Sequence, residues 1–173
     1  DRQEDELIVD DGDDGYSETG AWSAGANDDG YRGDYRTLEP GAGGVATWAA
    51  TLPGGSYHVS IRYVAGSNRT SEATVTIAHA GGQTVLPLDQ RVDSHRFLDL
   101  GAYQFAPGQR ATVTVEKGSG DGYVIADAAR WYCERYEERI DSSFDDDSLD
   151  FKRARSRLST AKRRGEIESA GRG

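Results

Sequence analysis

The stretch "GSYHVSIRYVAG", residues 55–66, decides the fold class. Its apolar and aromatic residues Tyr57, Val59, Ile61 and Tyr63 occupy every second position, and polar residues lie between them. Successive side chains of a β-strand point to opposite faces, so this period of two predicts a half-buried strand.

The next segment, "ATVTIAHAGGQTVLPL" from Ala73, repeats the alternation. Val75, Ile77 and then His79 fall on the inward side, and a Gly81-Gly82 pair separates them from a second short run. Paired glycines supply the backbone conformations that tight turns require, so the segment predicts a β-hairpin.

In the segment "FLDLGAYQFAPG" the alternation of inward and outward residues shifts by one position. Leu98 and Leu100 lie on one face, whereas beyond Gly101 the inward residues become Tyr103 and Phe105. An extra residue in one strand shifts the parity in this way, so we expect a β-bulge at the glycine.

Further strands are predicted on both sides of these segments. In "ATVTVEKGSGDGYVIADAARWY", Val113 and Val115 face inward, and the turn at residues 120–122 predicts a second hairpin. Earlier candidates are "ELIVDD", "DYRTL" and "GVATWAATL".

About eight short strands without a helical pattern between them predict an all-β fold. The 22 glycines and the hydrophobic content of 36% fit a loop-rich β protein better than a helical bundle. We therefore expect an antiparallel β-sandwich of the jelly-roll kind, in which two sheets enclose one core.

The charge distribution places a boundary at Cys133. Residues 1–133 contain twenty acidic and ten basic residues, and residues 134–173 contain ten of each, so the net charge of −10 belongs to the first part. We assign residues 1–6 to an N-terminal extension, 7–133 to the sandwich and 134–173 to a charged tail that is partly helical or disordered. The pattern at residues 148–164 allows a short basic helix, and the alternatives are a solvated linker or a segment that docks to a neighbouring domain or subunit.

The composition and motifs also exclude several classes of protein. The acidic body would repel phosphate backbones, so nucleic acid is not expected as a partner. No run approaches the roughly 18 apolar residues of a membrane span. The single cysteine, Cys133, forms no intrachain disulfide, and no phosphate loop, nucleophile elbow or HExxH motif is present, so we expect no enzyme activity.

Six segments together resemble the golvesin C-terminal-like domain, which also occurs as a non-catalytic part of xanthan lyase-like proteins. They are "IVDDGDDGYSETGAWS", "GYRGDYR", "ATWAATLPGGSYHVSIRYVAGSNRT", "TIAHAGGQTVLPLDQ", "LGAYQFAPG" and "DGYVIADAARW". The resemblance runs from about Leu7 to Trp131. It implies a secreted or cell-surface β-sandwich accessory domain that binds a polysaccharide. We expect no required cofactor.

Sugar binding requires an aromatic platform and polar groups for the hydroxyls. The candidates are Tyr31, Tyr35, Asn68, Arg69 and His79, whereas Trp22 is expected to fill the core. Arg62 and Arg69 would be natural partners of an anionic glycan, but a neutral glycan is easier to reconcile with the acidic body. The alternative is a structural or protein–protein interaction module in a surface or virion assembly, with the tail docking to a neighbour.

Asp127 lies within the apolar run "YVIADAARWY", where a carboxylate needs a partner. Sugar-binding jelly rolls commonly hold a structural calcium ion between their first and last strands, and Asp10 or Asp11 would meet Asp127 there. The other account makes Asp127 a structural acid that accepts hydrogen bonds from Arg69 or from loop N–H groups. The sequence favours the second account, because "DDGDDG" lacks the full spacing of an EF-hand loop.

Overall fold

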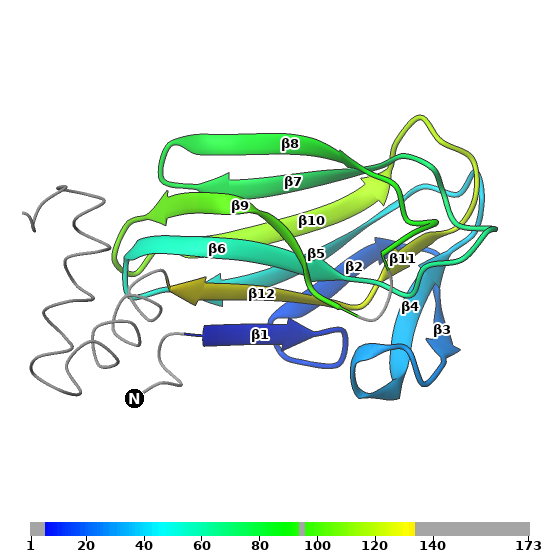
Figure 1. Cartoon of the computed structure of the whole chain (residues 1–173), viewed down its shortest axis with the longest axis horizontal. Coiled ribbons are helices and arrows are strands. Elements are labelled where there is room, and N and C mark those ends of the chain that lie inside the picture. The colour runs from blue at the N-terminus through cyan, green and yellow to red at the C-terminus, as the bar shows by residue number, and fades with distance from the viewer. Residues whose placement is uncertain (1–5, 94–95, 134–173) are drawn as a thin grey trace, which may run out of the picture. The chain divides into compact units, whose positions relative to one another are not determined.

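The computed structural model describes residues 6–93 and 96–133, and these residues form three antiparallel sheets (Figure 1). Sheet A has the order β1-β12-β6-β9, with strands Glu6–Asp10, Ala128–Cys133, Gly55–Arg62 and Leu98–Phe105. Sheet B has the order β2-β5-β10-β7-β8, with strands Tyr16–Gly20, Gly44–Thr51, Arg110–Lys117, Ala73–His79 and Gly82–Leu88. Sheet C has the order β11-β4-β3, with strands Val124–Ala126, Asp34–Leu38 and Trp22–Ala26. A short 3-10 helix, η2, covers Tyr31–Gly33.

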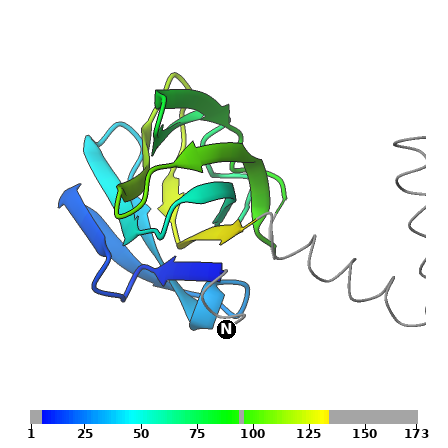
Figure 2. The ribbon, with the colours of Figure 1, turned by 90° about the vertical axis from the view of Figure 1, so that its left-hand side faces the viewer.

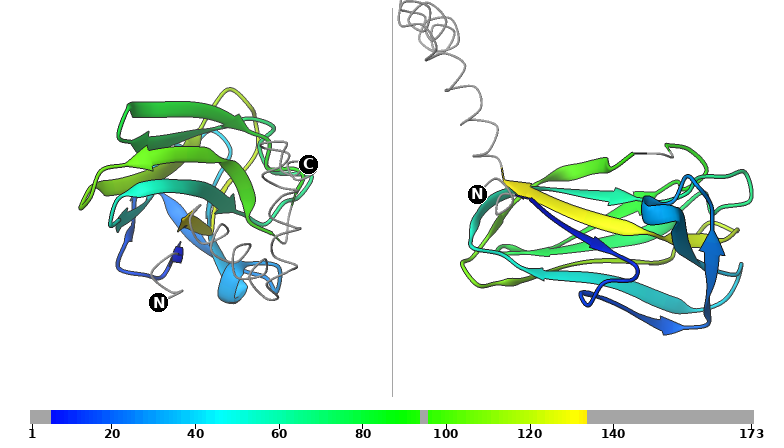
Figure 3. Two further views of the ribbon diagram at one scale, coloured as in Figure 1. Left: turned by 60° about the vertical axis from the view of Figure 1, so that its left-hand side comes forward. Right: turned by 90° about the horizontal axis from the view of Figure 1, so that it is seen from below.

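Sheets A and B face each other, as the end-on and lower views show (Figures 2 and 3), and most of the buried core residues belong to these two sheets. The alternating residues of β6 are buried as predicted, and so are the inward valines of β10. Trp48 on β5 and Trp131 on β12 are each fully buried and contribute the largest side chains. Burial of these alternating faces against each other stabilises the all-β sandwich that the sequence predicts.

The predicted hairpin and bulge around β7 to β9 are confirmed. Strands β7 and β8 pair antiparallel, with His79 opposite Gly82. Between β6 and β9 the register passes from His58 opposite Ala102 to Ser60 opposite Asp99, so two residues of β9 face one residue of β6. Gly101 lies in this bulge with φ of 115°, a conformation that favours glycine.

The second predicted hairpin is wrong. Strand β10 pairs with β5 and β7, and β12 pairs with β1 and β6, so the two belong to different sheets. The glycine-rich loop between them instead follows residues 68–72, because Tyr123 N–H donates to the Asn68 carbonyl and Thr70 N–H donates to the Tyr123 carbonyl. Gly122 has φ of 116°, and a Cβ there would lie 2.7 Å from the Arg69 backbone.

Strands β2 (Tyr16–Gly20) and β3 (Trp22–Ala26) lie between the predicted strands "ELIVDD" and "DYRTL", where no strand is predicted from the sequence. Trp22 on β3 is buried as expected, and its indole N–H donates to the Thr19 carbonyl at 2.9 Å. The described residues include no helix with the length and apolar content needed to cross a membrane. The expected charged tail and its basic helix lie outside the described residues.

Candidate functional site

Asp127 lies at the junction between β11 and β12, where the chain passes from sheet C to sheet A. Its side chain is fully buried, and both carboxylate oxygens accept the Tyr31 backbone N–H, at 2.9 and 3.2 Å. The Trp48 indole N–H donates to its carbonyl at 3.3 Å. A loop N–H group is therefore the partner of this carboxylate, and Arg69 instead donates to the Val64 carbonyl.

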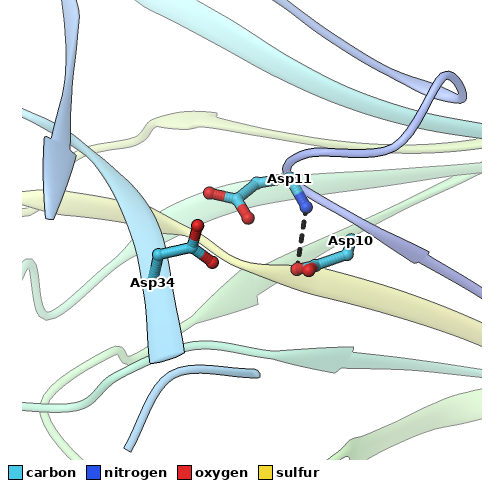
Figure 4. A group of neighbouring side chains, drawn as sticks. All are labelled: Asp10, Asp11 and Asp34. Carbon is cyan, nitrogen blue, oxygen red and sulfur yellow. Dashed lines mark hydrogen bonds between the residues drawn. The ribbon is translucent and has the colours of Figure 1, made fainter. Parts of the chain in front are cut away.

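Three other aspartates converge beside this junction, at the end of β1 and the start of β4 (Figure 4). Asp10, Asp11 and Asp34 each offer a carboxylate oxygen, and these oxygens lie within 4.8 Å of one another. Asp11 N–H donates to Asp10 Oδ1 at 2.9 Å. The exposed guanidinium of Arg32 lies 3.6 Å from Asp10 Oδ2.

These carboxylates carry more negative charge than the neighbouring cation balances. Burial, followed by repulsion from Asp10, Asp34 and Asp127, raises the pKa of Asp11 to about 8. Burial also raises the pKa of Asp10, and burial raises the pKa of Asp127 to about 7. Both desolvation and like charge disfavour ionised carboxylates. A bound proton or cation therefore stabilises this corner of the fold, which consists of Asp10, Asp11, Asp34 and Asp127.

Two features of this corner are those expected of a cation site. Asp11 Oδ1 is buried and has no hydrogen-bond partner among the described residues. Carboxylate oxygens are the hard ligands that Ca²⁺ prefers. The group that meets in space consists of Asp10, Asp11 and Asp34, whereas the carboxylate of Asp127 accepts the Tyr31 N–H.

An open hollow of about 410 Å³ adjoins the aspartates. It is lined by Asp11, Gly12, Tyr16, Ser17, Glu18, Ala24, Gly25, Asp34, Tyr35 and Arg36. Strands β2, β3 and β4 supply most of these residues. The hollow therefore combines aromatic rings with charged groups that donate and accept hydrogen bonds.

An ion pair fixes one side of the hollow. The Arg36 guanidinium donates to both carboxylate oxygens of Glu18, and the Tyr16 hydroxyl donates to Glu18 Oε1 at 2.9 Å. The hydrogen bonds from Arg36 lower the pKa of Glu18, so this carboxylate stays ionised. The Tyr35 ring lies against Gly25 of β3, because a Cβ at Gly25 would lie 2.5 Å from its Cε2 and Cζ.

The five predicted glycan contacts do not all come together. The Arg69 guanidinium carbon lies 5.8 Å from the centre of the Tyr35 ring, and Arg69 Nη1 donates to Asn68 Oδ1 at 2.8 Å. Tyr31 lies beside Asp127. His79 lies at the β7–β8 turn, at the end of β7 remote from Ala73, where it contacts Thr84 and stacks on Tyr103.

Asp34, Glu18 and Arg36 were missed as site residues. The predicted strand "DYRTL" places Asp34 and Arg36 on one face, which is a usable signal. Strands β2 and β3 carry the opposing residues, however, and their Gly-rich and Ser-rich sequences lack a clear alternation. Because the sequence does not predict these two strands, it offers no reason to expect Glu18 or Asp11 close to β4.

The architecture is that of the β-sandwich found in carbohydrate-binding modules. It matches a family 35 carbohydrate binding module from Clostridium thermocellum with a TM-score of 0.54 and 16% identity, covering 74% of this chain and 98% of that module. It also matches a xanthan lyase from Paenibacillus with a TM-score of 0.71 and 27% identity, covering 77% of this chain and 13% of the lyase.

Residues 7–132 match the Golvesin C-terminal domain, and the chain belongs to this family. A xanthan lyase of Bacillus sp. (strain GL1) is 35% identical over 133 residues. This similarity covers 72% of the present chain and 14% of that relative, so the chain spans only a small part of the lyase's length.

Proposed function

We propose that this chain is a non-catalytic, extracellular carbohydrate-binding module whose glycan site is the hollow beside Tyr35. The observation that carries the proposal is one open hollow that is lined by Tyr16 and Tyr35 together with Glu18, Arg36 and Asp34. The family and the shared sandwich support it, because one matched structure is a carbohydrate-binding module and the relative is named for a polysaccharide-cleaving activity.

The chemistry of the hollow suits a neutral sugar. The Tyr35 ring offers an apolar surface to the C–H face of a pyranose. The carboxylates accept hydrogen bonds from sugar hydroxyl groups, and the Arg36 guanidinium donates to a ring or hydroxyl oxygen. Acidic side chains around the hollow would repel a carboxylate-bearing sugar, so we assign a neutral sugar residue to this site.

Calcium has a structural role in this proposal. Asp10, Asp11 and Asp34 would hold the ion, which would fasten the β1–β2 loop to the start of β4. Asp11 and Asp34 also line the hollow, so the bound ion would fix one wall of the glycan site.

Replacing Tyr35 with Ala should weaken glycan retention at least tenfold. The test is affinity electrophoresis of the whole chain through gels that contain xanthan, β-1,4-mannan, β-1,3-galactan, xylan or β-glucan. We expect at least one neutral polymer to retard the wild type, Tyr35→Phe to keep most of the retardation and Tyr35→Ala to lose at least tenfold in affinity. Val85→Ala, an exposed position on β8, is the control. Migration unaffected by every polymer would contradict the proposal.

The metal-free chain should lose stability as the pH rises from about 4 to 8. The pKa values of Asp11 and Asp127 are higher in the folded chain than the ordinary value of 3.8, so the unfolded chain releases these protons first. Their contribution is therefore full below about pH 4 and is lost as the pH passes through the folded-state values. Thermal melting in chelator at pH 5 and pH 8.5 measures this loss.

Calcium should reverse that loss at pH 8.5. An ion at 100 times its dissociation constant stabilises the folded state by about 2.7 kcal/mol. We expect Asp34→Asn to reduce the calcium response and Asp99→Asn, which lies outside the corner, to leave it unchanged. An equal melting temperature with chelator and with calcium would remove the ion from the proposal.

A further inference from the structure

The outer face of sheet A carries a continuous row of aromatic rings and guanidinium groups. This arginine–aromatic row consists, in order, of His58, Tyr132, Arg130, Phe97, Arg62 and Tyr31. Side chains of β6 and β12 alternate between the core and this face, so residues next to the buried Val59 and Trp131 point outward. None of these side chains contributes to the hollow at Tyr35.

Short ring and guanidinium contacts hold the row together. The Arg130 guanidinium carbon lies 4.8 Å from the centre of the Phe97 ring and 4.6 Å from that of Tyr132. The Tyr132 ring stacks on His58, with centres 5.0 Å apart and planes 14° apart.

The other end of the row is built in the same way. Arg62 lies 5.9 Å from the Phe97 ring and 5.7 Å from the Tyr31 ring, and these two rings are 5.7 Å apart. The row thus alternates cations with flat apolar surfaces across β6 and β12.

Three polar atoms on this face are buried without a hydrogen-bond partner among the described residues. They are Ser60 Oγ, Arg62 Nε and Arg130 Nε. Ser60 pairs directly with Arg130 across the two strands, and Arg62 is two residues further along β6, so the three groups are neighbours. A hydroxyl and two guanidinium N–H groups can all donate, and together they suit an acceptor that carries negative charge.

Charged groups of both signs lie on this face. Glu6 lies 3.5 Å from Arg130, and Asp99 lies 3.4 Å from His58. Arg62 donates to the Asp29 carbonyl at 3.2 Å. The guanidinium groups of Arg62 and Arg130 are the two permanent cations of the row.

We propose that the arginine–aromatic row binds a carboxylate-bearing sugar, a uronic acid residue of an acidic polysaccharide. Arg62 and Arg130 would receive the carboxylate, while the partly exposed rings of Phe97 and Tyr31 would contact the sugar ring that carries it. This site is separate from the hollow. It distinguishes charged from uncharged sugars, whereas the hollow binds a neutral sugar residue.

Titration calorimetry with trigalacturonate and with its trimethyl ester tests the proposal, because the ester removes the charge of each carboxyl group and adds only one methyl group to it. We expect the wild type to bind the acid at least tenfold more tightly than the ester. The double variant Arg62→Gln/Arg130→Gln should bind the acid at least tenfold more weakly. The control Arg110→Gln/Lys117→Gln removes the same charge from exposed positions on β10 and should bind within twofold of the wild type.

Equal affinities for acid and ester, undetectable binding of the acid, or an unaffected double variant would each overturn the proposal. If the double variant melts well below the wild type, the single variant Arg62→Gln replaces it, with a loss of at least threefold expected. Tyr35→Ala should leave trigalacturonate binding unchanged, so failure of this site and failure of the hollow are distinguishable.

Discussion

Replacing Gln90 with Ala should lower the free energy of unfolding by about 2–6 kcal/mol. Gln90 is fully buried. The two polar atoms of its side-chain amide pair with the backbone of β11, as the backbone of a neighbouring strand would. Its Nε2 donates to the Ile125 carbonyl at 2.9 Å, and Ile125 N–H donates to its Oε1 at 2.8 Å. Truncation leaves two buried backbone groups unpaired, at about 1–3 kcal/mol each.

Two further variants separate hydrogen bonding from volume. Gln90→Met keeps most of the volume but neither hydrogen bond, so it should be almost as unstable as the Ala variant. Gln90→Glu keeps the acceptor for Ile125 N–H but, when ionised, cannot donate to the Ile125 carbonyl, and it also buries a charge. Urea unfolding followed by tryptophan fluorescence measures all three, and a loss below 1 kcal/mol for Gln90→Met would contradict this account.

Replacing Trp131 with Ala should cost about 3–5 kcal/mol, because a fully buried indole leaves a cavity between the sheets. That loss is a large part of the 5–15 kcal/mol that typically stabilises a domain. Chemical unfolding monitored by circular dichroism gives the value.

Phenylalanine variants of the two buried tryptophans give the matched comparison. Trp131 Nε1 is buried without a partner among the described residues, whereas the Trp48 indole N–H donates to the Asp127 carbonyl. Trp131→Phe removes an unpaired donor, and Trp48→Phe removes a bonded one, so Trp48→Phe should be the more destabilising by about 1 kcal/mol. The reverse order would contradict the stabilising hydrogen bond described between Trp48 and the Asp127 carbonyl.

Side-chain alternation was sufficient to predict the sandwich. The period of two in β6, β7 and β10 indicates which face of each strand is buried. Gly101 indicates the bulge, because few other residues adopt its backbone conformation. Alternation does not report which strands pair. The loop at residues 118–123 resembles a hairpin turn in sequence, yet its backbone hydrogen bonds go to residues 68–72.

The candidate site was harder to predict because its residues come from strands with weak patterns. Tyr35 was identified from its residue type, and Asp10 and Asp11 from their place at the end of the first strand. Asp34 reaches these aspartates only through the arrangement of β4 beside the β1–β2 loop, which local sequence does not encode. The arginine–aromatic row likewise depends on the pairing of β6 with β12.

The most direct test of the proposed glycan site is a two-dimensional ¹H–¹⁵N NMR titration of the whole chain with neutral trisaccharides of mannose, galactose, xylose and glucose. One of them should shift the amide signals of Glu18, Gly25 and Tyr35 in a saturable way and leave the β7–β8 turn at His79 unchanged. Saturable shifts confined to that turn, or no saturable shift with any of the four sugars, would contradict the account.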